Sequence, residues 1–312
     1  MKKFFKILLW VFIIFFILIN FISATNAYKF THFYNPGEVV TKPAAQKDFW
    51  DHTGDILFGN DYVKKANAPM PDSFSKVIFT TKDKTKLEAW YSTVNEAKGS
   101  VALFHGYGDN KTDILQEGKI FLSMGYNVLL LDFRGHGGSG GNTCTIGYLE
   151  GEDVKLAYDF LKNKGEKNIV LWGISMGAAA VAHSIEEYDL QPSKVILEMP
   201  FATMQDAVEG QLRTMHLPDE PLGTLLTFWG GIEHGFWAYS MNPEKYVKDI
   251  HCPVLIQVGQ HDQRVAPEER KEVFENLSQP KQLVIYNNSG HESLCKKEPA
   301  KWIASVSAFL NS

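Results

Sequence analysis

The 312-residue chain lacks several features that would point to other classes of protein. Its three cysteines are an odd number and give no disulfide framework. Its formal net charge of −5 at pH 7 gives no basic excess for nucleic acid, so we expect no such partner. We expect neither a metal nor a cofactor, because six histidines show no ligand spacing with cysteines or carboxylates. These histidines are His32, His52, His183, His216, His234 and His251.

One long apolar run stands at the N-terminus. Residues Ile7 to Ile22 are almost unbroken hydrocarbon and follow Lys2, Lys3 and Lys6. As a helix these sixteen positions span about 24 Å, and flanking phenylalanines with a snorkelling Lys6 bring this close to the ~30 Å of a bilayer core. We predict that residues 1–27 are a transmembrane anchor with a cytoplasmic N-terminus and an extracytoplasmic body.

A cleaved signal peptide is the alternative for the same segment. The small residues "TNA" at 25–27 could serve as a cleavage site, which would leave a secreted or periplasmic protein. The apolar run is longer than the ~7–15 residues usual in a signal peptide, which favours the retained anchor. Either process takes the body out of the cytoplasm.

Residues 28–73 form a connector with proline and glycine punctuation and several large apolar residues. It is too apolar for a free linker, so we expect part of it to pack on the body or on the membrane surface. The body itself is expected to span residues 74–312.

Short apolar runs alternate with helical patterns through the body. Several runs, such as "VLLLDF" and "IVLW", are apolar on both faces, as buried parallel strands are. The alternation predicts an α/β fold, with a mostly parallel sheet covered by helices on both faces. The strands are expected at 77–80, 87–94, 101–105, 128–132, 169–172, 195–198, 254–258 and 283–286, and the helices near 112–124, 151–163, 176–188, 267–277 and 299–310.

Residues 201–243 interrupt this alternation. The segment separates two expected strands by more than forty positions, which is too long for a plain connection. We expect it to carry its own helices and to form a small cap over one edge of the sheet. Its aromatic residues could line an apolar pocket, or could only attach the cap to the body.

Ser175 lies in the sequence "LWGISMGAAA", between an expected strand and an expected helix. Glycines two positions on either side tolerate the crowded turn that exposes a nucleophilic serine. Acyl transfer also needs N–H donors for the developing oxyanion. We expect them from Met176, at the start of the helix, and from Tyr107 in the loop "HGYG".

A serine nucleophile needs a base, and the base needs an orienting acid. Asp262 follows an apolar strand 87 residues after Ser175, and His291 follows the last strand 29 residues later. The order Ser, Asp, His is the one used by α/β-hydrolases. In the first loop, His105 is expected to hydrogen-bond the loop that Gly106 and Gly108 make, instead of acting as the base.

From about residue 74 onward the chain resembles the α/β-hydrolases, and within them the serine aminopeptidase and lysophospholipase-like branch with its membrane-anchored members. Seven stretches carry the resemblance in the right order: "LEAWY", "HGYG", "DFRGHGGS", "GISMG", "LEMPF", "CPVLIQVGQHD" and "SGHESL". The resemblance implies an eight-stranded sheet, a helical cap after the sixth strand, and a triad of Ser175, Asp262 and His291.

The sequence therefore predicts a membrane-anchored serine hydrolase that cleaves a small-molecule acyl or lipid-like ester through an acyl-enzyme. Three other activities stay open at this point. The scaffold could carry an aminopeptidase, with an acidic group in the cap (Glu209, Asp219, Glu220 or Glu233) for the substrate amine. It could carry an acyltransferase, which passes the acyl group to an alcohol or amine. It could also be a catalytically silent binding module on a membrane tether.

Overall fold

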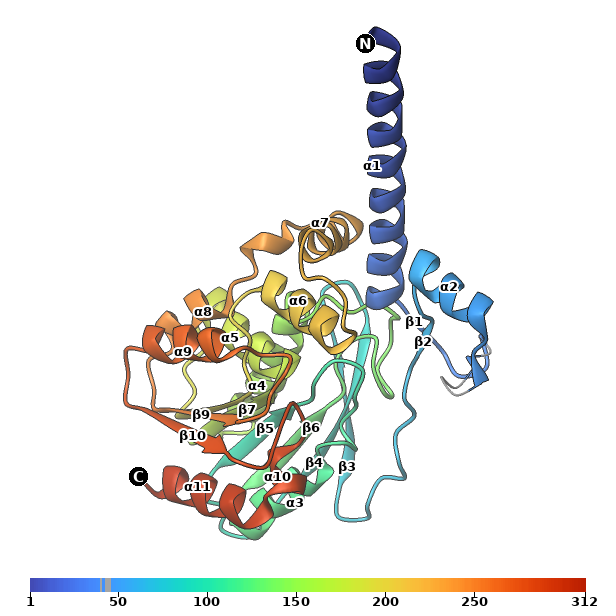
Figure 1. Cartoon of the computed structure of the whole chain (residues 1–312). Coiled ribbons are helices and arrows are strands. Elements are labelled where there is room, and N and C mark those ends of the chain that lie inside the picture. The colour runs from blue at the N-terminus through green and yellow to red at the C-terminus, as the bar shows by residue number, and fades with distance from the viewer. Residues whose placement is uncertain (40, 43–45) are drawn as a thin grey trace.

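A long helix stands apart from the rest of the molecule in Figure 1. The computed structural model describes residues 1–39, 41–42 and 46–312. Helix α1 (Lys2–Thr31) projects from the body, and apolar side chains from Phe4 to Phe21 are exposed along it. Thirty residues give a length of about 45 Å, more than the hydrocarbon core of a bilayer. Among the described residues α1 is the one helix long and apolar enough to cross a membrane.

The body is built on an eight-stranded sheet, as predicted. The strands are β3 (Ser75–Thr80), β4 (Lys86–Ser92), β5 (Ser100–Phe104), β6 (Asn127–Leu131), β7 (Ile169–Ile174), β8 (Lys194–Glu198), β9 (Val254–Gly259) and β10 (Lys281–Tyr286). Their order is β10-β9-β8-β7-β5-β6-β4-β3, and only β4 runs antiparallel to its two neighbours. The central strands β5, β6, β7 and β9 are buried at every position, which explains their unbroken apolar sequences.

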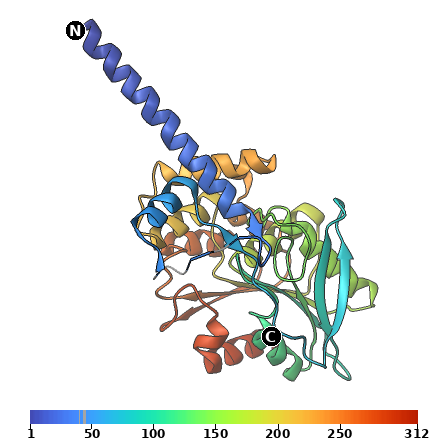
Figure 2. The same ribbon diagram turned by 90° about the vertical axis from the view of Figure 1, so that its right-hand side faces the viewer.

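Helices cover both faces of this sheet (Figures 1 and 2). One face carries α3 (Leu115–Ser123), α10 (Leu294–Lys297) and α11 (Pro299–Asn311), which share a hydrophobic core with the strands. The other face carries α4 (Glu150–Asn163), α5 (Met176–Tyr188), α8 (Pro243–Tyr246) and α9 (Pro267–Asn276), over a second core. The predicted doubly covered α/β sheet is therefore confirmed.

The connector is not a free linker. After α1, β1 (Phe33–Tyr34) pairs in parallel with β2 (Tyr62–Val63), and α2 (Phe49–Phe58) lies between them in sequence and packs beside α1. Beyond β2, the amide of Asn67 donates to Asp132 in the body. Residues 40 and 43–45 of the predicted connector lie outside the described residues. The helix also continues through Thr31, four residues past the expected end of the anchor.

The predicted cap segment carries helices of its own. These are α6 (Met204–Thr214), α7 (Leu222–His234) and the short 3-10 turn η2 (Ala238–Ser240). Helix α7 lies along the lower half of α1, and the indole nitrogen of Trp229 donates to the side-chain oxygen of Asn20 at 3.2 Å. The cap therefore joins the base of α1 to the body.

Candidate active site

Ser175 occupies a sharp turn between β7 and α5. Its backbone has φ 52° and ψ −114°, in a region that non-glycine residues rarely adopt. Its N–H donates to the backbone oxygen of Glu198 at 2.8 Å, which fixes the turn to the next strand. The strained turn lifts the hydroxyl out of the buried strand and over the carboxyl end of the sheet.

The two glycines of the motif are required by close backbone contacts. A Cβ on Gly173 would lie 2.4 Å from the backbone oxygen of Gly177. A Cβ on Gly177 would lie 2.2 Å from the backbone oxygen of Phe104. The strand and the helix approach each other more closely than any side chain permits, so the spacing Gly-x-Ser-x-Gly has a steric cause.

Ser175, His291 and Asp262 form one chain of hydrogen bonds. The oxygen Oγ of Ser175 lies 2.9 Å from Nε2 of His291, and Nδ1 of His291 lies 2.9 Å from Oδ2 of Asp262. Because an ionised carboxylate can only accept, Nδ1 carries the proton and Nε2 is left as the acceptor for the serine hydroxyl. The arrangement is the one in which a histidine can act as a base toward Ser175.

Asp262 is held as a carboxylate despite its burial. Its side chain is 1% exposed, and burial alone would raise its pKa. The bond from His291 and the backbone N–H groups of Arg264 and Val265, which donate to Oδ1 at 2.8 and 3.0 Å, outweigh that effect. These hydrogen bonds keep the pKa of Asp262 below its ordinary value, so Asp262 keeps its negative charge next to Nδ1 of His291.

Two buried histidines, His105 and His136, form hydrogen bonds to the backbone of the loop "HGYG" (residues 105–108). The N–H of Phe133 donates to Nε2 of His105, so Nδ1 of His105 carries the proton and donates to the oxygen of Gly106 at 2.7 Å. Nε2 of His136 accepts from the N–H of Gly108 at 3.2 Å. Burial lowers the pKa of His105 to about 3, so this imidazole is neutral. The two rings fix the backbone on either side of Tyr107.

The structure brings the two expected oxyanion donors to the same end of the sheet as Ser175. A Cβ built on Gly106 would lie 3.8 Å from Cβ of Ser175, which places the loop against the serine. Within the described part of the chain, neither the N–H of Tyr107 nor that of Met176 has an acceptor.

A cleft of about 440 Å³ opens at Ser175 and carries charges of both signs. Its lining residues include Arg264, Lys296, Lys297, Asp109, Asp113 and Glu292. Burial and the neighbouring carboxylate of Asp113 raise the pKa of Asp109 to about 6. None of the four cap acids expected for an aminopeptidase lines this cleft among the residues that the structure describes.

A buried carboxyl group behind the nucleophile was not assigned from the sequence. Oε1 of Glu198 accepts from the indole nitrogens of Trp172 at 3.0 Å and Trp302 at 2.5 Å, and burial raises the pKa of Glu198 to about 8. The signal was present, because a lone glutamate ends the apolar run "VILE". Its partner Trp302 comes from the last helix, which the sequence alone does not bring there.

Glu198→Gln is expected to remove a pH-dependent part of the stability. In the wild type, the unfolded carboxyl ionises above its ordinary pKa of 4.5 while the folded one stays protonated up to about 8. The contribution of Glu198 to the free energy of unfolding is therefore greatest below pH 4.5, and it is lost as the pH rises to about 8. The melting temperature of the variant should rise relative to the wild type between pH 5 and 8. A difference in melting temperature that is constant with pH would contradict this.

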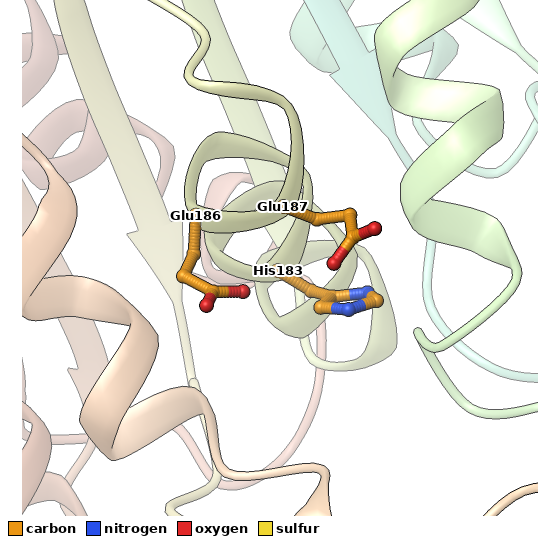
Figure 3. A group of neighbouring side chains, drawn as sticks. All are labelled: His183, Glu186 and Glu187. Carbon is orange, nitrogen blue, oxygen red and sulfur yellow. The ribbon is translucent and has the colours of Figure 1, made fainter.

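The described residues hold one group that could bind a metal ion, shown in Figure 3. It comprises His183, Glu186 and Glu187 on α5, of which the two glutamates are exposed. The ring nitrogen Nδ1 of His183 lies against the backbone of Gly151, where an added Cβ would be 2.8 Å away. His183 also follows Ser175 by eight residues, about 12 Å along the helix. The group is therefore separate from the Ser175 cleft.

The fold and this site are those of a class of proteins in which an α/β sheet carries a serine on a sharp strand-to-helix turn. The profile of the serine aminopeptidase family S33 matches residues 95–226. The YqkD protein of Bacillus subtilis is 28% identical over 270 residues, 84% of each chain. The Pyrococcus furiosus esterase Pf2001 superimposes with a TM-score of 0.66 at 25% identity, over 80% of this chain and 95% of that one.

A lysophosphatidylserine lipase, ABHD12 of Danio rerio, is 26% identical over 210 residues, 62% of this chain. The matched part spans about half, 51%, of that lipase. The chain has the α/β-hydrolase fold and is similar, over residues 95–226, to the serine aminopeptidase family. It is accordingly a hydrolase of the esterase and lipase kind.

Proposed function

We propose that the chain is a serine hydrolase that cleaves a carboxylic ester of an acyl or lipid-like molecule. The observation that carries the proposal is the hydrogen-bonded chain from Ser175 through His291 to Asp262 at the carboxyl end of the sheet. In this proposal Ser175 is the nucleophile, His291 the general base and Asp262 the acid that holds the base in its working tautomer.

The reaction proceeds in two steps. His291 takes the proton of Ser175 as Oγ attacks the ester carbonyl, and the N–H groups of Tyr107 and Met176 stabilise the oxyanion. His291 then gives its proton to the leaving alcohol, and an acyl-enzyme forms. A water molecule, deprotonated by His291, then attacks the acyl-enzyme. The bond between the acyl group and Oγ breaks, His291 returns its proton to Oγ of Ser175, and the carboxylic acid leaves.

Two observations favour an ester of a lipid-like molecule over an aminoacyl substrate. The cap acids that would bind a substrate amine do not line the described cleft at Ser175. The loop beside Ser175 also contacts the end of a helix of transmembrane length, because Tyr107 stacks on Phe30 of α1, and such a helix would hold the enzyme beside lipids. We therefore propose water as the acyl acceptor and a membrane-derived ester as the donor.

For the localisation we propose a retained, single-pass anchor with the catalytic body on the extracytoplasmic side. Ala27, the last residue of the possible cleavage site, is 4% exposed and lies inside α1. Asn26 bonds to the backbone of α2, and the oxygen of Phe30 accepts from Tyr107. Cleavage after residue 27 would divide a segment that packs on the body on both sides of the cut.

A fluorophosphonate probe tests the proposal directly. It should label the intact chain in detergent, and peptide mass mapping should place the label on Ser175. Ser175→Ala should remove the labelling, whereas Ser123→Ala on the outside of α3 should keep it. Absence of labelling, or labelling that survives in Ser175→Ala, would exclude the serine mechanism. Comparison of p-nitrophenyl esters with aminoacyl anilides then separates an esterase from an aminopeptidase.

A further inference from the structure

A mostly apolar cavity of about 110 Å³ lies at the base of α1, outside the cleft that holds Ser175. Three helices form its walls. Helix α6 contributes Met204, Val208 and Leu212, which share one face because they are four residues apart. Helix α7 contributes Leu226 and Gly230, and α1 contributes its last two turns. The volume is of the order of a cavity that holds one benzene ring (~150 Å³), so it suits a short stretch of alkyl chain.

The wall made by α1 is in direct contact with the oxyanion loop. Phe30 lines the cavity, and its ring stacks on that of Tyr107 with centroids 4.4 Å apart. The hydroxyl of Tyr107 donates to the backbone oxygen of Phe30 at 2.5 Å. The residue before Tyr107 lies against Ser175. One aromatic side chain, Tyr107, thus links the cavity wall to the loop beside the proposed nucleophile.

The cavity also lies where α1 would leave the membrane. Its α1 residues begin at Asn26, about one helical turn after the apolar run that ends at Ile22. Helix α7, another wall of the cavity, also contacts α1 at Asn20, inside that run. An alkyl chain that leaves the lipid phase along α1 would therefore pass the residues that line the cavity.

We propose that this cavity binds the alkyl chain of the substrate, and that the last two turns of α1 are one wall of the binding site. The anchor is then part of the enzyme's specificity as well as its tether. The inference rests on the proposed function for the identity of the reacting ester, but the cavity's binding of an alkyl chain can be measured without catalysis.

Gly230 offers a way to fill the cavity. It lies within α7 and lines the cavity, and a Cβ added there would meet no atom within 4 Å. The side chain of Gly230→Leu can therefore leave the backbone without a clash at Cβ, and we expect it to extend into the cavity. Gly54 in α2 is a matched control, because it is also a helical glycine with open space around its Cβ and is not part of the cavity lining.

The first measurement compares the rates at which ethyl and dodecyl fluorophosphonates label the full chain in detergent. In Gly230→Leu the dodecyl probe should react roughly tenfold more slowly, with the ethyl probe unchanged, because a pocket that loses the space of a few methylenes discriminates by about that factor. Gly54→Leu should behave as the wild type. Equal slowing of both probes, or no slowing, would overturn the inference.

The second measurement needs no reaction at Ser175. A long-chain fatty acid with a terminal diazirine is photo-crosslinked to the full chain, and the modified peptides are mapped. Crosslinks should fall on residues 26–31 and 226–236 and should be lost in Gly230→Leu but kept in Gly54→Leu. Crosslinks that do not change in Gly230→Leu would refute the cavity assignment. If these crosslinks appear while no fluorophosphonate reacts, the binding site stands and the serine hydrolase proposal fails.

Discussion

Ser175→Ala, His291→Ala and the double variant are expected to lose nearly the same amount of esterase activity, roughly 10⁶-fold in kcat. The hydroxyl of Ser175 and Nε2 of His291 are 2.9 Å apart, and each works only through the other. Without Ser175, His291 has no hydroxyl to deprotonate. Without His291, the hydroxyl of Ser175 has no base. The losses should therefore not add. Initial rates with a p-nitrophenyl ester, measured for all four proteins in the same detergent, give the comparison.

His261→Ala provides the matched control for the histidine. His261 is exposed and stands next to Asp262, and its bond to Ser289 is made by its backbone N–H, which alanine keeps. This variant should hydrolyse the ester at the wild-type rate. If the double variant lost far more activity than either single variant, Ser175 and His291 would be acting in separate steps, and the relay proposed here would be incorrect.

The sheet was predictable because its signal is local. Strands β5, β6, β7 and β9 are buried along their whole length, and their sequences are apolar at nearly every position. A central strand that is buried on both faces has apolar side chains at nearly every position, and this is the pattern seen in the sequence. The order of reactive residues past the strand ends followed from the same reasoning, since parallel strands deliver their carboxyl ends to one edge.

The contacts that hold the site residues in place could not be predicted from the sequence in this way. Glu198 meets Trp302 across more than a hundred residues of sequence, and Tyr107 meets Phe30 across 77. Such contacts depend on how elements far apart in the sequence pack together. Neither residue lies in a sequence pattern that indicates its partner. For residues 28–73 the sequence predicted that part of the connector packs on the body or on the membrane surface, but it did not indicate that Lys64 and Asn67 donate the hydrogen bonds to the body.

The contact between Tyr107 and Phe30 changes how the N-terminal helix is understood. A tether only has to keep the enzyme near its substrate, and any apolar helix of sufficient length would serve. Here the end of α1 lies against a loop that is already fixed by His105 and His136. The N-terminal helix, the cap and the loop that holds Tyr107 thus meet at one place. In the anchored enzyme that we propose, this packing would set the position of the active site relative to the membrane.

Asp262→Asn is expected to lower kcat by roughly 10⁴-fold while the protein stays folded. The amide oxygen of asparagine can still accept from the N–H groups of Arg264 and Val265, so the loop keeps its bonds. The amide nitrogen would then face Nδ1 of His291 and, being a donor, would force Nδ1 to accept. The proton would move to Nε2, which points at Ser175, and the base would be lost.

Asp249→Asn tests whether the effect belongs to this carboxylate. Asp249 is exposed and lies before the strand that leads to Asp262, so its replacement should leave kcat unchanged. Melting temperatures of both variants report folding separately from catalysis. An Asp262→Asn protein that melts like the wild type and keeps its full rate would show that the carboxylate does not orient the base. A loss of activity far larger than any fall in melting temperature is what a tautomer effect predicts, because the variant keeps the packing around residue 262 and moves the proton of His291.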